Sequence, residues 1–176
     1  TISQKTENPL RTISQKTTIE ITPKEMNDIR TNIKLQLEKK TGKCNEIGYI
    51  DSIKEITHID KGQISAEDLS ANVYFNVEFN CDMYIPNQNT QIIGKVKTVN
   101  NQLLTCSVGD KNQIIIFIPK ENVSTDNFNI NNNYLHYKSK KEIQIDDNLL
   151  INLVTIKVNN NDSHIKCIGY LKDICT

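Results

Sequence analysis

The sequence predicts an α+β protein with a small N-terminal β-α-β-β domain followed by a five-stranded OB-type β-barrel. Three observations lead to this prediction. One amphipathic helical pattern lies between residues 23 and 42, and segments of alternating apolar and polar residues flank it. The run Pro-Asn-Gln-Asn at 86–89 interrupts the pattern near the middle of the chain. From residue 91 onward the apolar residues alternate with period two, and one long polar segment divides them, as in a Greek-key barrel.

The N-terminal elements follow from local signals. Residues 18–22 alternate like a half-buried strand, and Pro23 then opens a helix with Thr22 as N-cap and Glu25 three residues on. Four apolar residues repeat along one face of this helix, which ends near Gly42: Met26, Ile29, Ile33 and Leu37. Residues 47–59 and 71–85 are predicted strands, with a loop at 64–70 between them. A domain of this size needs its open faces covered by another body to be stable.

The barrel is predicted from residue 87 to residue 176, which makes 18–86 the N-terminal domain. The expected strands are 92–99, 103–108, 113–118, 149–158 and 164–174. Asn100-Asn101 and Gly109-Asp110 supply hairpin turns, and residues 120–141 form a long polar loop.

Residues 1–17 contain a duplication, because TISQKT occurs at 1–6 and again at 12–17. Two copies of six residues are too short for a repeat fold. Such polar segments bury too little apolar surface to order themselves. We therefore expect a polar, disordered extension here.

Composition narrows the class of protein. The net charge is +0 and the pI about 6.8, which argues against a protein held to nucleic acid by bulk positive charge. The chain has five cysteines and none is spaced C-x-x-C, so a disulfide framework or a zinc site is poorly supported. We expect a reducing compartment, the nucleus or the cytoplasm, or a virion if the protein is viral, with no membrane span and no signal peptide.

No catalytic constellation is visible. His58, His136 and His164 share no spacing with acidic residues or cysteines, and Cys44 is interpreted as a packed thiol. The pair Asp146-Asp147 is interpreted as a turn at the start of a strand. The sequence therefore predicts no enzyme active site, no cofactor and no metal ion.

Several motifs occur in the order typical of one family. Gly42-Lys43-Cys44 precedes Gly48-Tyr49, segments 62–86 and 94–109 follow, Phe117-Ile118-Pro119 closes a strand, and 158–171 ends in IGYL. Over residues 18–173 the chain resembles the stalk subunit of multisubunit DNA-directed RNA polymerases, namely the seventh subunit of eukaryotic RNA polymerase II and its archaeal counterpart. The many Ile, Asn and Lys residues fit a parasite or a large DNA virus with an AT-rich genome.

The resemblance implies a noncatalytic stalk subunit that acts in transcription. It would dock beside the polymerase clamp and present the barrel near the RNA exit path. Its partners would be the large polymerase subunits, a second stalk subunit and, weakly, nascent RNA. The alternative is a free-standing OB-fold RNA-binding or translation factor, which would lack the exposed apolar patch that docking needs on the N-terminal domain. The residues that decide between them are Ile47, Ile64, Leu69 and Val73.

The resemblance also implies the docking residues. Two segments, 42–49 and 62–71, are expected at one end of the small sheet, facing the polymerase. The docking residues are Gly42, Lys43, Cys44, Gly48, Tyr49, Gly62, Ile64 and Leu69. The RNA candidates combine rings with cations: Tyr134, Tyr137, Lys138, Lys140 and Lys141. Thr105 stands where RNA-binding barrels of this superfamily carry an aromatic, so we expect weak, strongly salt-sensitive RNA binding.

Overall fold

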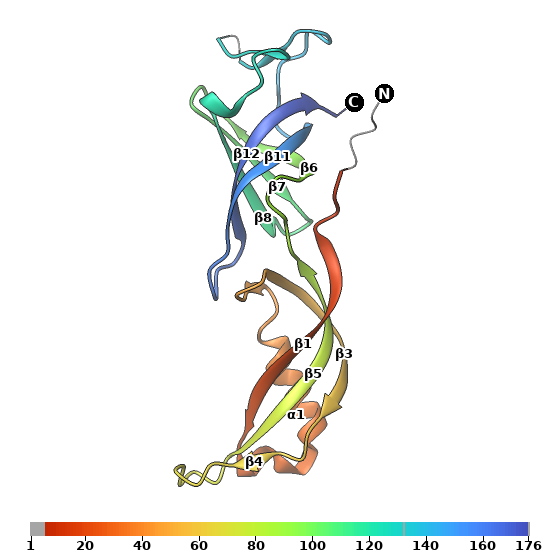
Figure 1. The fold of residues 1–176 in the computed structure, drawn as a ribbon, viewed down its shortest axis with the longest axis vertical. Helices are drawn as coiled ribbons and strands as arrows, with labels where there is room; N and C mark the ends of the chain where they lie inside the picture. Colours follow the sequence, from red (N-terminus) through yellow and green to blue (C-terminus); the bar gives the residue numbers. More distant parts are fainter. Residues whose placement is uncertain (1–5, 132, 176) are drawn as a thin grey trace. The chain divides into compact units, whose positions relative to one another are not determined.

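The computed structural model describes residues 6–131 and 133–175 (Figure 1). They form two compact units. The first, here called the sheet unit, comprises Leu10–Lys43 and Ile50–Met83. The second, the barrel unit, comprises residues 6–9, Cys44–Tyr49 and the chain from Tyr84 onward. The short segment before the second long strand thus packs with the barrel.

The sheet unit is built on three long strands. These are β1 (Leu10–Ile21), β3 (Tyr49–Ile59) and β5 (Val73–Tyr84), and the sheet runs β1-β5-β3-β2. The two short strands are β2 (Lys43–Cys44) and β4 (Gln63–Ile64), and β4 pairs with β5. Helix α1 (Ile29–Glu38) lies across one face of this sheet (Figure 1). Alternate residues of β5 are buried on that side: Phe75, Val77, Phe79, Cys81 and Met83.

The predicted helix is in fact two consecutive helices, because a second N-cap residue lies within it. Residues Pro23–Asp28 form a 3-10 helix, η1, whose Glu25 carboxylate accepts a hydrogen bond from the Thr22 backbone N–H at 3.0 Å. Asp28 then caps α1 by accepting from the Thr31 N–H at 3.3 Å. The pattern of apolar residues continues through both helices, but only Ile33 and Leu37 are fully buried.

Strand β1 begins at Leu10, eight residues before the predicted start. The expectation of disorder is therefore wrong for residues 10–17, including the second TISQKT copy. The polar side chains of β1 bond to β5 across the open face of the sheet. Thr12 Oγ1 donates to Asp82 Oδ1 at 2.6 Å, and Lys16 Nζ lies 2.8 Å from Glu78 Oε1. Most of the first copy, residues 1–5, lies outside the described residues.

The predicted five-stranded barrel is confirmed as a closed barrel. Its strands are β6 (Gln91–Val99), β7 (Leu103–Val108), β8 (Ile114–Pro119), β11 (Asn148–Lys157) and β12 (Ile165–Ile174). They close in the order β11-β12-β8-β7-β6, and β12 runs parallel to β8. The interior is packed closely, because a Cβ added at Gly169 would lie 2.5 Å from Ile151 Cγ2.

The long polar segment after β8 carries structure of its own. It contains η2 (Lys120–Asn122) and a hairpin of β9 (Phe128–Asn129) and β10 (Leu135–His136). Phe128, Tyr134 and Ile143 are buried in the core cluster of the barrel unit. This segment therefore adds to the core of the barrel unit.

Candidate functional site

The 62–71 segment, which joins β3 to β5, presents exposed apolar side chains. Leu69 is 100% exposed and Ile64 is 66% exposed. The segment is nevertheless held in place. Asp68 accepts hydrogen bonds from the Ser70 N–H at 2.9 Å and from the Tyr74 hydroxyl at 3.0 Å. These bonds fix the turn on both sides of Leu69 and leave its side chain in solvent.

Hydrogen bonds also fix the entry to this segment. Asp60 accepts from the Gly62 N–H at 3.0 Å, and from the Asn76 backbone and side chain at 3.0 and 2.9 Å. Desolvation raises the pKa of Asp60, but these hydrogen bonds outweigh it and leave the pKa below its usual value. Gly62 has φ +77°, and a Cβ there would lie 2.7 Å from the Phe75 ring, so a side chain would disturb this turn.

The 42–49 segment is partly buried, and its exposed residues are Gly42, Lys43, Glu46 and Ile47. Cys44, Gly48 and Tyr49 are buried, which leaves these residues unavailable to a partner. The Cys44 N–H donates to the Asp162 carbonyl at 2.8 Å, and its own carbonyl accepts from Asn161 at 2.9 Å. These bonds attach the segment to the turn between β11 and β12. Of the docking residues predicted here, only Gly42 and Lys43 are exposed.

Gly48 is required for space. A Cβ at this position would lie 2.2 Å from the Tyr84 carbonyl oxygen. A side chain would therefore push β3 and β5 apart where the two strands begin and end. The demand for glycine here is steric, and no unusual backbone dihedral is involved.

The expectation that 42–49 and 62–71 lie at the same end of the sheet is wrong. The first segment precedes β3 and the second follows it, and β3 is 11 residues long. At about 3.3 Å per residue the two ends of this strand are roughly 35 Å apart. A partner that binds the 62–71 segment therefore need not touch the 42–49 segment.

The residues predicted to bind RNA differ in how far they are exposed to solvent. The Tyr134 ring is 1% exposed and its hydroxyl donates to the Asn100 carbonyl at 2.9 Å, so it is not available to stack on a base. Tyr137 is 52% exposed. Lys138 and Lys140 are exposed, whereas Lys141 Nζ is engaged with Asp147 Oδ1 at 2.8 Å. One exposed ring and two exposed lysines, Lys138 and Lys140, remain from this set. Thr105, half-buried on β7, adds no stacking surface.

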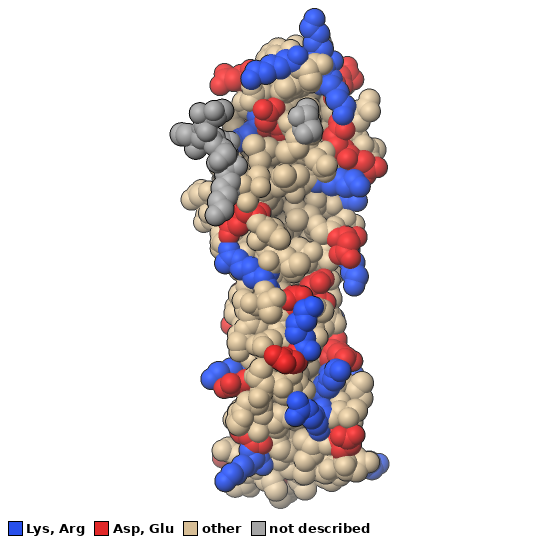
Figure 2. Space-filling view, turned by 90° about the vertical axis from the view of Figure 1, so that its right-hand side faces the viewer, with Lys and Arg blue, Asp and Glu red and all other residues tan. Residues whose placement is uncertain are grey.

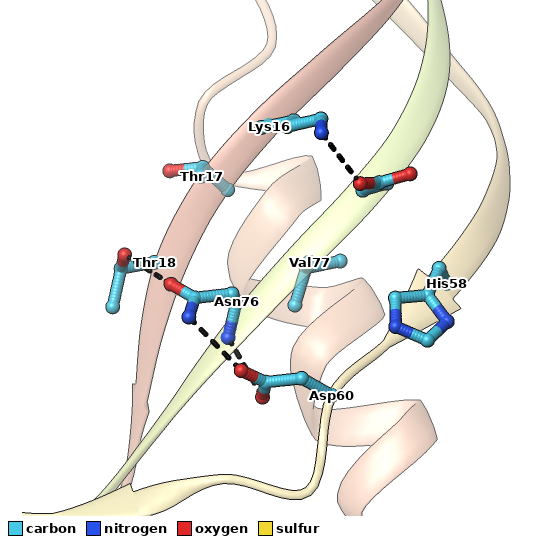
Figure 3. A pocket seen from close by; sticks show the side chains of 8 residues that line it. Lys16, Thr17, Thr18, His58, Asp60, Asn76 and Val77 are labelled. Carbon is cyan, nitrogen blue, oxygen red and sulfur yellow. Dashed lines mark hydrogen bonds and ion pairs between the residues drawn. The ribbon is translucent and has the colours of Figure 1, made fainter.

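A polar groove of about 390 Å³ lies on the open face of the sheet unit (Figure 3). Its lining side chains largely bond to each other. Lys16 pairs with Glu78, and Thr18 Oγ1 donates to Asn76 Oδ1 at 3.0 Å. The hydrogen bond from Lys16 lowers the pKa of Glu78. These groups serve to hold β1, β5 and β3 together.

The reactive side chains fit structural roles. Burial raises the pKa of Cys106 and Cys167 to about 12 and that of Cys44 and Cys81 to about 11. Asp146 has φ +72° and Asp147 accepts from the Gln144 N–H at 3.0 Å, which is a turn. Within residues 6–131 and 133–175, no group of three potential metal ligands is assembled. No helix in the same residues is long and apolar enough to cross a membrane.

Charges of both signs are interspersed on the surface. Figure 2 shows Lys and Arg side chains beside Asp and Glu side chains over the face it presents, without one extended basic area. This distribution matches the net charge of +0. Long-range attraction to a nucleic acid is accordingly weak on this face.

Comparison with known proteins gives one informative similarity. A protein of Acanthamoeba polyphaga mimivirus, described as "Putative DNA-directed RNA polymerase subunit", is 28% identical to this chain over 139 residues. The similar region covers 78% of this chain and 68% of the mimivirus protein. No protein-family model matches. The resemblance to a divergent viral RNA polymerase subunit, indicated by the sequence motifs, is confirmed.

Proposed function

We propose that this chain is a subunit of a DNA-directed RNA polymerase and acts in transcription. The observation that carries the proposal is the similarity to the mimivirus polymerase subunit over most of both chains. The ordered motifs from residue 18 to residue 173 agree with it. Its partners in this role are the other subunits of that polymerase.

Within this role the chain is a noncatalytic stalk subunit. It docks on the polymerase through the 62–71 segment, whose Leu69 and Ile64 are exposed although the segment is ordered by hydrogen bonds. A fixed loop loses little conformational entropy on binding, so its apolar side chains can contribute their burial energy to affinity. Such exposure would be a liability on a free-standing RNA-binding factor, which is why the docking role is favoured.

The barrel then lies near the RNA exit path and contacts nascent RNA weakly. In the segment after β8, an exposed ring for stacking is supplied by Tyr137, and exposed positive charges are supplied by Lys138 and Lys140. Because only about two exposed lysines of the set are involved, the affinity should fall with salt less steeply than the sequence predicts.

The test is purification of the native protein. A tagged copy expressed in the natural host or infected cell is recovered under gentle lysis, and the associated proteins are identified by mass spectrometry. Recovery of the large polymerase subunits in stoichiometric amounts supports the proposal. A free monomer in the same fractions that contain intact polymerase would refute it.

A further inference from the structure

The outer edge of β3 is largely open. In the sheet order β1-β5-β3-β2, strand β2 has two residues while β3 has eleven. Most of this edge therefore has no neighbouring strand among residues 6–131 and 133–175. An open edge of this length is a template on which another strand can pair.

Two hydrogen bonds show which backbone groups point outward. The Gly42 N–H donates to the Ile50 carbonyl at 2.9 Å, and Arg30 Nη2 donates to the Ile56 carbonyl at 3.4 Å. Backbone groups alternate between the two edges of a strand, so the even-numbered residues between 50 and 56 also present theirs outward. The Arg30 contact is long and comes from a side chain, so an incoming N–H can replace it.

A groove of about 350 Å³ runs beside this edge. Arg30, Thr31 and Lys34 of α1 form one wall, and residues 53–56 of β3 form the other. Ile53 and Ile56 are half-buried and give the groove apolar surface. The site thus combines an unpaired backbone edge with a place for side chains.

The charge of the groove is positive. Lys54 is paired with Asp82 at 3.0 Å, and Glu55 accepts from the Asn80 side chain at 3.0 Å. Arg30 and Lys34 are exposed and have no acidic partner in the described parts of the chain. Lys54 and Asp82 offset each other, and Arg30 and Lys34 outweigh the Glu55 carboxylate, so the groove keeps a net positive charge beside an apolar surface.

We propose that this groove binds an extended acidic and apolar segment of another protein chain, which adds to the sheet as a strand beside β3. Main-chain hydrogen bonds to the open edge would supply affinity. Ile53 and Ile56 leave β3 on opposite faces, because side chains alternate along a strand, so the apolar residues on one face of the segment would lie on one of these two isoleucines. Its carboxylates would meet Arg30 and Lys34, where Arg30 exchanges a carbonyl for a charged acceptor.

A single-stranded nucleic acid is a poorer fit to the same groove. Phosphates could meet the two cations, but a backbone edge and two isoleucines offer nothing for bases to stack on. The groove also shares no residue with the 62–71 segment. Binding here is therefore separate from docking through Leu69, and it can be measured on the isolated chain even if the polymerase role fails.

The probe is a fluorescein-labelled peptide of eight residues with alternating glutamate and valine and blocked ends. Fluorescence anisotropy measures its binding, and hydrogen exchange measures protection of the amides at 52–58. We expect binding in the micromolar to millimolar range and protection at the even-numbered residues of β3. The double change Arg30→Glu and Lys34→Glu should weaken binding at least tenfold. The matched change Lys24→Glu, at an exposed lysine of η1, should leave it unaltered.

Three further ligands decide the mode of binding. A glutamate–valine peptide with every amide N-methylated keeps the charges but cannot pair with an edge, and it should not bind. A lysine–valine peptide should bind at least tenfold more weakly, and a single-stranded RNA oligonucleotide should leave the β3 amides unprotected. The proposal is overturned if the first peptide fails to bind at 1 mM, or if the N-methylated peptide, the lysine–valine peptide or the RNA gives the same protection.

Discussion

Replacing the two exposed apolar residues of the 62–71 segment by serine should separate docking from folding. Burial of a Leu or Ile side chain in an interface contributes about 1.5–3 kcal/mol. Leu69 is 100% exposed and can contribute the full amount, while Ile64, 66% exposed, can contribute about two thirds of it. The double variant Ile64→Ser and Leu69→Ser should therefore lose about 2.5–5 kcal/mol of binding free energy. This corresponds to a drop in affinity of about a hundredfold to a thousandfold or more.

The same variant should fold normally, because substitutions of exposed residues change stability by about 0.5 kcal/mol or less. Urea denaturation checks this point, and co-purification with the large polymerase subunits checks docking. Ile145→Ser is the matched control, since Ile145 is 63% exposed but belongs to the barrel unit. If the double variant co-purifies as well as the wild type and the control, the segment is not the docking element and the reasoning fails.

Three other outcomes test the structure. In the native protein only Cys175 should react within minutes with a thiol reagent, whereas the four buried thiols should react only after denaturation. Rapid modification of more than one thiol would contradict the packing. Gly48→Ala should destabilise the fold by about 1–3 kcal/mol in urea melts, because its Cβ would collide with the Tyr84 carbonyl; wild-type stability would show that the strands part freely. The pKa of Asp82 lies below its usual value of 3.8, and the largest cause is the hydrogen bond from Thr12. The ionised Asp82 carboxylate therefore stabilises the fold above pH 3.8, and this stabilisation is lost as the pH falls through the folded-state pKa. Unfolding free energies measured from pH 7 to pH 3 should therefore decline less steeply in Thr12→Val than in the wild type, and equal slopes would refute this assignment.

The barrel could be predicted because its signals are local. Each strand alternates, and the turns carry residues suited to them: Asn100 accepts from the backbone N–H groups of Gln102 and Leu103, and Gly109 has φ +92°. No long-range information is needed to place such strands. Leu69 and Ile64 are predicted from the family resemblance, and the structure adds that both side chains are exposed.

What the sequence could not show depends on partners that are distant along the chain. Residues 10–17 look disordered because they bury little, but Thr12 is bonded to a residue 70 positions away. Tyr134 looks like a stacking ring because polar residues surround it. Only the folded segment shows that its ring fills the core and that its hydroxyl is bonded to Asn100. Neither of these two hydrogen bonds produces a periodic pattern in the sequence from which it could be predicted.

The sheet unit combines two kinds of surface that a self-contained domain would cover. The 62–71 segment offers apolar side chains on a loop held by Asp68, and the outer edge of β3 offers backbone groups beside Arg30 and Lys34. A body this small buries too little surface to leave both exposed without consequence, since its own core is modest. The first surface suits a rigid partner with an apolar pocket, whereas the second suits a flexible segment that becomes ordered on binding. Two differently shaped contacts on one small unit are what a subunit held between larger proteins requires, and this agrees with a place in a polymerase assembly better than with a free-standing binding factor.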